Sequence, residues 1–235
     1  AGRSVSASPF YRVIGAPNHQ GRGAVIVVYP PAASSSISSP DLQTGEAFGD
    51  SVALWDDVIV AGDPLNNTAG SAAGAAFILS RNQGGSNAWG VVKRLAPSPL
   101  PATAEFGRSA ALYRDTAAVG APYEEDFVNS LGAVYVFQAN RGGSNNWGQV
   151  RRIKVPGADA AYLGWSVALW GDVLAVGAVG DDEGALDSGA VFLFERNRGG
   201  ADNWGLLKKV KPPTPQDSAA FGWSVALLGD RLVVG

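Results

Sequence analysis

The sequence predicts an all-β fold, a β-propeller of four-stranded antiparallel blades with about four full repeats and a partial fifth. The first observation is a repeated motif centred on a glycine, which Phe or Leu precedes in four of its five copies. The glycines of the five copies are Gly2, Gly49, Gly107, Gly164 and Gly222. The second observation is that each full copy contains short strand-like segments, while no segment shows a sustained helical period. Tandem units of this kind are typical of propellers, whereas the alternative, a β-sandwich, does not require near-identical units.

Residues 1–235 form one predicted propeller region, because each repeat can bury its apolar face only against its neighbours. The repeats run over residues 2–48, 49–106, 107–163, 164–221 and, as a partial copy, 222–235. A closed ring holds about four to eight blades. We therefore expect this region to belong to a larger ring, which further blades of the same polypeptide or a second copy would complete.

The first predicted strand of each unit alternates small or polar residues with apolar ones, as in residues 51–55. A two-residue turn follows, and its length and chemistry suit a tight hairpin. These turns are Asp56-Asp57, Arg114-Asp115, Gly171-Asp172 and Gly229-Asp230. The second strand is a β-branched run such as residues 58–61. A Gly-Ala-Pro-like element (the GAP element) ends it, since proline lacks the backbone donor that a strand needs.

The third predicted strand is the most apolar, as in residues 132–137 and 189–194. A polar turn with a tryptophan follows, and the fourth strand comes next, at residues 91–95, 150–154 and 207–211. Eight of the 18 basic residues lie on these fourth strands. Because Lys and Arg discourage edge-to-edge pairing, we place the fourth strand at the outer edge of each sheet and the small-residue first strand near the propeller axis.

The composition argues against several classes of function. The net charge of −3 gives no electrostatic basis for binding nucleic acid, and no run approaches the roughly 18 apolar residues that span a bilayer. Without cysteine, the chain has neither disulfides nor thiolate metal sites. His19 is the only histidine, and no serine beside it has a motif context, so we predict that the protein is not an enzyme. A glycosidase-type pair of carboxylates stays open, although most acids are turn residues.

The Phe-Gly pairs at residues 48–49, 106–107 and 221–222, together with GAP elements such as residues 120–122, resemble FG-GAP repeats. These repeats form the blades of integrin α-subunit propellers and of many bacterial and algal surface proteins. The likeness extends over essentially the whole chain. The first repeat departs most, because Pro30-Pro31 and the serine-rich residues 34–39 replace the tryptophan turn and the basic strand. The resemblance implies an extracellular, cell-surface module of the adhesion or scaffold type.

Integrin-type blades often carry a calcium loop between the first two strands, but here that hairpin is too short to wrap an ion that needs about six to eight oxygens. The chain therefore resembles a calcium-free branch of the family, and we expect no metal site and no cofactor. Acidic residues cluster instead after the second strand. They are Glu124, Glu125 and Asp126 in one repeat, and Asp181, Asp182, Glu183 and Asp187 in the next. The second group is the best calcium candidate, with a solvated turn as the default interpretation.

The tryptophans form two groups. One repeat position, at the start of the fourth strand, is occupied by Trp89, Trp147 and Trp204, which favours packing between adjacent blades. Trp165 and Trp223 follow the repeat glycine, where other repeats have Asp50 and Arg108. Because this position is not uniformly aromatic, Trp165 and Trp223 are the candidate ligand-contacting residues.

These observations favour a noncatalytic extracellular module that presents loops or blade edges to a protein or glycan partner. The alternatives are a carbohydrate-binding, lectin-like propeller that uses exposed tryptophans, and an accessory domain of a larger enzyme or adhesin. We expect neither a nucleic acid partner nor direct membrane insertion. Residues 66–68 fit the N-glycosylation pattern, so Asn66 is a candidate glycosylation site and supports passage through the secretory pathway.

Overall fold

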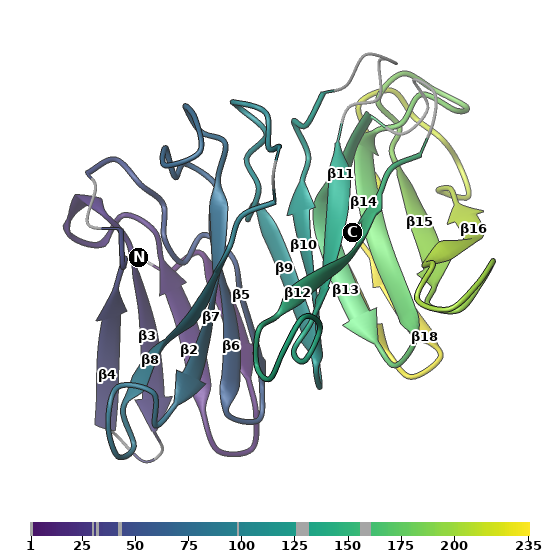
Figure 1. Ribbon diagram of the computed structural model, residues 1–235. Coiled ribbons are helices and arrows are strands. Elements are labelled where there is room, and N and C mark those ends of the chain that lie inside the picture. Colours follow the sequence, from purple (N-terminus) through teal and green to yellow (C-terminus); the bar gives the residue numbers. More distant parts are fainter. Residues whose placement is uncertain are drawn as a thin grey trace.

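The computed structural model describes residues 2–29, 31, 33–41, 44–97, 99–125, 132–155 and 161–235. It contains four four-stranded antiparallel sheets and one two-stranded sheet, arranged in chain order along an open arc (Figure 1). Within the described ranges, the one helical segment is the short 3-10 turn η1 (His19–Gly21). The predicted all-β propeller is therefore confirmed, as several blades that do not close into a ring.

Sheet order equals sequence order in every blade. The first blade consists of β1 (Ser4–Ala7), β2 (Arg12–Ala16), β3 (Ala24–Tyr29) and β4 (Ala33–Ser38). The second consists of β5 (Val52–Trp55), β6 (Val58–Asp63), β7 (Ala75–Arg81) and β8 (Trp89–Leu95). The third consists of β9 (Ser109–Tyr113), β10 (Thr116–Ala121), β11 (Ala133–Gln138) and β12 (Gly148–Ile153). The fourth consists of β13 (Ala161–Trp170), β14 (Val173–Gly180), β15 (Ala190–Glu195) and β16 (Gly205–Val210), and the fifth of β17 (Val225–Leu228) and β18 (Arg231–Val234).

The first strand of each blade lies innermost, as its small residues predict. The first strands of successive blades contact one another. A serine lies two positions after each repeat glycine, and in the first four blades it donates a hydrogen bond across the junction. Ser51 Oγ donates to the carbonyl oxygen of Gly107 at 2.8 Å, and Ser109 Oγ donates to that of Gly164 at 2.7 Å. Ser4 and Ser166 make the same bond to Gly49 and Gly222. This serine therefore ties each blade to the next.

The glycine of the GAP element is required by the same junction. A Cβ atom on Gly120 would lie 2.0 Å from the Gly164 carbonyl oxygen and 2.4 Å from Ser109 Oγ. A Cβ atom on Gly62 would lie 1.9 Å from the Gly107 carbonyl oxygen. Both distances are far inside van der Waals contact, so no side chain fits. The repeated motif thus encodes contact between blades.

The hydrophobic core lies between the blades, as expected when one repeat cannot bury its own apolar face. The residue before the repeat glycine is buried at three junctions, as Phe48, Phe106 and Leu163. The repeated tryptophans Trp89, Trp147 and Trp204 are buried as well. Trp89 packs edge-on against Tyr11 of the preceding blade, with ring centroids 5.6 Å apart. The predicted packing role of this tryptophan position is confirmed.

The hairpins between first and second strands have the predicted two residues in the second to fifth blades, whereas four residues separate β1 from β2 in the first blade. Asp56 and Arg114 take the left-handed conformation, with φ of 47° and 54°, which tight hairpins need. In the first blade the serine-rich segment forms β4 and pairs with β3. This divergent repeat therefore keeps its fourth strand, although it lacks the basic residues of the others.

Candidate functional site

The residues that follow the repeat glycines form a row along one end of the first strands, the upper end in Figure 1. We call this row the FG rim; it consists of Arg3, Asp50, Arg108, Trp165 and Trp223. An Arg3 Nη1 to Asp50 Oδ1 ion pair of 2.7 Å starts the row. The Arg108 guanidinium lies 5.1 Å from the Trp165 ring, and the Trp165 and Trp223 rings lie 4.7 Å apart. The rim therefore has a charged half and an aromatic half, and it brings the two predicted residues together.

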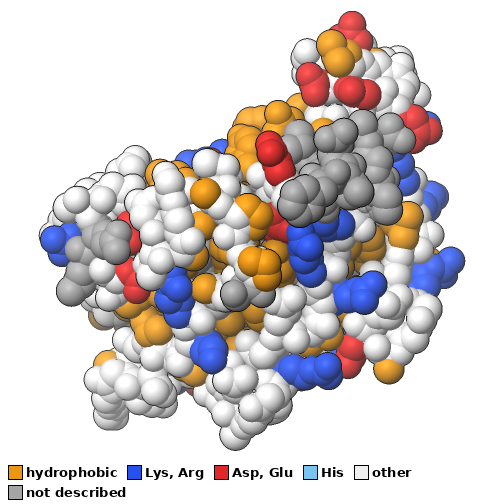
Figure 2. All heavy atoms as spheres, turned by 45° about the horizontal axis from the view of Figure 1, so that its top comes forward, with side chains coloured by type: hydrophobic (Ala, Val, Ile, Leu, Met, Phe, Trp, Pro, Cys, Tyr) orange, Lys and Arg blue, Asp and Glu red, His pale blue; other side chains and the backbone are white. Residues whose placement is uncertain are grey.

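Two tyrosines that sequence reasoning did not single out enlarge the aromatic half. Tyr123 follows β10 and Tyr162 lies in β13, with ring centroids 5.4 Å apart. Both rings also lie near Trp165, at 6.2 and 6.4 Å. A cavity of about 330 Å³, which we call the aromatic slot, is lined by Tyr123, Tyr162, Trp165, Val179, Gly180, Asp187, Ser218 and Ala220. Trp223 beside it is 58% exposed, and Figure 2 shows hydrophobic side chains exposed among charged ones on this face.

The charged half of the FG rim is neutralised internally. Burial raises the pKa of Asp50, and the charges of Arg3 and Arg108 oppose this shift. Glu105 pairs with Arg108 at 3.5 Å, and burial raises its pKa as well. Since these arginines already face carboxylates, the aromatic half is the part of the rim that offers unused contact surface.

The acidic loops after the second strands bind the basic fourth strands of the same blade. In the third blade Glu124 is fully buried, and Arg152 Nε donates to its Oε1 at 2.7 Å. The Tyr135 hydroxyl donates to Glu124 Oε2 at 2.6 Å, and Lys154 Nζ lies 3.8 Å from Oε1. Burial and the neighbouring carboxylate raise the pKa of Tyr135. We call this contact the loop clamp; it gives the fourth-strand cations a second role besides protecting an edge.

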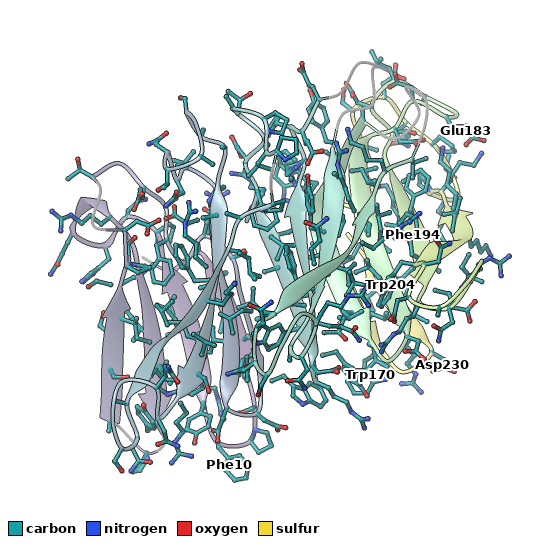
Figure 3. All side chains as sticks on the ribbon, in the orientation of Figure 1. Phe10, Trp170, Glu183, Phe194, Trp204 and Asp230 are labelled. Atoms are coloured by element: carbon teal, nitrogen blue, oxygen red, sulfur yellow. The ribbon has the colours of Figure 1, made fainter. Side chains whose placement is uncertain are left out.

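The fourth blade repeats the loop clamp with lysines. Asp181 is fully buried, and its Oδ2 lies 2.7 Å from Lys209 Nζ. Glu183, at the upper end of this blade in Figure 3, accepts hydrogen bonds of 2.7 Å from Lys209 and Lys211. These two lysines lower the pKa of Glu183 to about 2. Two ammonium groups therefore neutralise the carboxylates that the sequence offered as calcium ligands.

The other members of the acidic groups do not assemble into a metal site either. Asp182 Oδ1 accepts the backbone N–H of Asp187 at 2.7 Å, as in a closed turn. Over the described ranges, no three His, Cys, Asp or Glu side chains converge as they would around a metal ion. Asp126, in the other predicted group, lies outside the described residues. The solvated-turn interpretation therefore fits Asp182 and Asp187, and the loop clamp describes Asp181 and Glu183.

Asn66 takes the place of the loop acid in the second blade. Its side chain is fully buried, and Nδ2 donates to Asp41 Oδ2 at 2.8 Å and to Glu46 Oε1 at 2.9 Å. Its Oδ1 accepts a hydrogen bond from Arg94 Nη2 at 2.8 Å. A glycan on Nδ2 would replace these bonds and has no room in the folded chain. The geometry therefore argues against the glycosylation predicted at Asn66.

Two further features mark the divergence of single repeats. In the first blade the counterparts of the clamp residues are His19, whose carbonyl accepts the Gly23 N–H, and Ser36, which pairs with Ile26. The first blade therefore lacks both the acidic and the basic residue of the loop clamp. In the second blade Asp63 replaces the alanine of the other GAP elements and is fully buried. Burial, with smaller contributions from neighbouring carboxylates, raises the pKa of Asp63 to about 7.

A second aromatic group closes the opposite end of the first strands. The rings of Trp55, Tyr113 and Trp170 come from three successive blades, with centroids 4.5 to 6.3 Å apart. Figure 3 shows Trp170 at this lower end. Because these rings pack mainly on one another around the axis, we interpret them as structural. The lower end also has a cavity, of about 540 Å³, which Trp55 and Trp147 line together with Asp56, Arg114, Asp115 and Asn145. The two ends of the propeller therefore differ in the lining of their cavities, and the slot walled by two tyrosines belongs to the FG rim.

Tandem four-stranded blades, joined by the serine and glycine contacts of one repeated motif, define a β-propeller scaffold. The family model of the FG-GAP repeat matches residues 33–79, 89–137 and 147–194, together more than half of the chain. The chain therefore belongs to the FG-GAP repeat family, whose repeats are commonly noncatalytic binding or adhesion-type modules. A comparison with curated proteins found no match.

Proposed function

We propose that this FG-GAP propeller is a noncatalytic extracellular binding module that contacts a protein partner through the aromatic half of the FG rim. The observation that carries the proposal is the juxtaposition of Trp165 and Trp223 beside a cavity walled by two tyrosines. Tryptophan and tyrosine dominate the energetics of protein interfaces because they bury a large area with few rotatable bonds. Trp165 and Trp223 stand at a repeat position where other repeats have charged residues.

Two observations support a noncatalytic, extracellular role. His19 is the only histidine, it is exposed, and within the described ranges no hydrogen bond joins its ring to a serine or an acid. The family to which the chain belongs typically occurs in extracellular proteins. From this family membership we propose a scaffold or adhesion role at the cell surface. Separately, no described helix is long and apolar enough to cross a membrane.

A glycan is the second candidate partner, because the slot combines aromatic rings with polar groups. Asp187 and Ser218 lie on the same cavity as the tyrosines, and sugar sites join ring stacking to hydrogen bonds with hydroxyls. A module of either kind would also serve as an accessory domain of a larger enzyme or adhesin.

The proposal is tested by selecting ligands without assuming their identity. The chain is panned against a random peptide display library and, in parallel, applied to a glycan array. Ligands found by either route should lose binding at least tenfold to Trp165→Ala and Trp223→Ala, while Trp170→Ala at the opposite end serves as the matched control. Ligands that bind the rim variants as well as they bind the unaltered chain would exclude the FG rim as the contact surface.

A further inference from the structure

The aromatic slot includes Gly180 and Ala220, which belong to the junction between the fourth and fifth blades. At the equivalent place, the preceding junction has a pair of tyrosines. Between the third and fourth blades, the residue after the GAP element is Tyr123 and the residue before the next Leu-Gly pair is Tyr162, and their ring centroids lie 5.4 Å apart at 69°. Their counterparts at the next junction are Gly180 and Ala220. Two rings present at one junction are therefore replaced by two small residues at the other.

The rings of the tyrosine-bearing junction also form walls of the slot. Its volume is about 330 Å³, and Tyr123, Tyr162 and Trp165 line one side of it. Gly180 contributes to this arrangement, because a Cβ atom there would lie 2.7 Å from the Tyr162 ring. Ala220 has a φ of 52° and Tyr162 a φ of 63°, so both residues have a positive φ. The two positions thus agree in φ and differ in their side chains.

We propose that the slot binds a tyrosine side chain of the partner protein, which occupies the place that Tyr162 fills at the preceding junction. This inference rests on the proposed function. A phenol ring meets the three rings of the slot edge to face, the geometry already seen between Tyr123 and Tyr162. Within the described ranges the Asp187 side chain accepts no hydrogen bond, so its carboxylate is available to a phenol hydroxyl that donates.

The Trp165 ring already has a cation on it, because the Arg108 guanidinium lies 5.1 Å from its centroid. A lysine or arginine from a partner would have to compete with Arg108 for the same ring, whereas a neutral aromatic side chain would not. A sugar is less well matched than a tyrosine, because Val179, Gly180 and Ala220 present no polar side-chain atom. A neutral aromatic side chain with one hydroxyl uses both the apolar walls and Asp187.

One substitution would fill the slot with a side chain of the protein itself. Ala220→Tyr places a tyrosine at a positive φ similar to the one that Tyr162 already adopts, so the variant should fold and should occupy the cavity. Trp165→Ala removes a wall of the cavity instead of filling it. The probes are N-acetyl-tyrosinamide, N-acetyl-leucinamide and methyl β-glucopyranoside, titrated by saturation-transfer NMR into the unaltered chain and both variants.

The proposal predicts that N-acetyl-tyrosinamide binds the unaltered chain at least fivefold more tightly than either other probe. Both variants should weaken this binding at least tenfold, and Asp187→Asn should weaken it several-fold. Preference for the glucoside, equal binding of the leucine probe, or no binding of tyrosinamide would each overturn it. If display selection yields rim-dependent peptides without an aromatic residue, this inference fails while the proposed function stands. If no ligand depends on Trp165 and Trp223, both fail.

Discussion

Removing the arginine of the loop clamp in the third blade should destabilise the fold far more than removing the arginine beside it. Arg152 donates to the fully buried Glu124, whereas the neighbouring Arg151 is exposed and forms no ion pair within the described ranges. Arg152→Ala leaves the Glu124 carboxylate buried with one cation fewer. Arg151→Ala removes the same charge and nearly the same bulk from the same strand, so it is the matched control.

The magnitude follows from the burial of the two partners. Breaking a buried ion pair costs about 3 to 5 kcal/mol, because a charge is left without its partner. Here the Arg152 side chain is 42% exposed, and Lys154 stays 3.8 Å from Glu124, so solvent and the lysine screen part of the loss. We therefore expect a decrease of about 2 kcal/mol in the free energy of unfolding for Arg152→Ala. For Arg151→Ala we expect a change of less than about 0.5 kcal/mol.

Urea unfolding followed by tryptophan fluorescence measures both variants under the same conditions. At this chain length, about 2 kcal/mol corresponds to a decrease of about 4 to 8 °C in the thermal midpoint. Adding Glu124→Gln to Arg152→Ala should restore part of the stability, since the buried group then carries no charge. Equal stabilities of the two single variants would refute the loop clamp as a stabilising contact.

Three further perturbations test other parts of the structure. The pKa of Asp63, about 7 when folded against about 3.9 when unfolded, means that the folded state holds its proton more tightly. Stability should therefore fall by up to about 4 kcal/mol as the pH rises from about 4 to about 7. Asp63→Ala should flatten this slope in urea unfolding; an unchanged slope would assign it to other groups. Gly177→Ala should destabilise the junction by about 2 kcal/mol or more, because its Cβ would lie 2.0 Å from the Gly222 carbonyl oxygen. Gly171→Ala, with open space around its Cβ, should cost about 1 kcal/mol by calorimetry, and the reverse order would contradict the junction geometry. Adding a chelator should leave the thermal midpoint unchanged, because Lys209 and Lys211 already neutralise Asp181 and Glu183. A decrease of several degrees would show a structural ion.

The repeat period and the strand patterns are sufficient to predict the blades, because each strand's environment recurs in every copy. The burial of Trp89 and its two counterparts follows from the same periodicity. The sequence also offers Trp165 and Trp223 as candidates, since they break the pattern of their repeat position, and the structure places their rings 4.7 Å apart. Their role in binding stays a prediction.

Contacts between residues far apart in the chain could not be predicted in this way. Tyr123 and Tyr162 are 39 positions apart and meet only because blade geometry brings the GAP element against the next Phe-Gly or Leu-Gly pair. The loop clamp joins Glu124 to Arg152 across two strands, so the acids and bases looked like separate features of a loop and an edge. The burial of Asn66 depends on acids from the preceding connection, which a local sequon pattern does not include.

The most direct test of the FG rim as a binding surface uses the chain's own tryptophans. Its seven indole N–H groups report on the rim, the blade junctions and the lower end of the propeller. A selected ligand is titrated into ¹⁵N-labelled chain, and the indole resonances are assigned by single Trp→Phe substitutions. The proposed function predicts that the signals of Trp165 and Trp223 move, while those of Trp55 and Trp170 stay in place. Movement confined to Trp55 and Trp170 would contradict it and would place the binding surface at the opposite end.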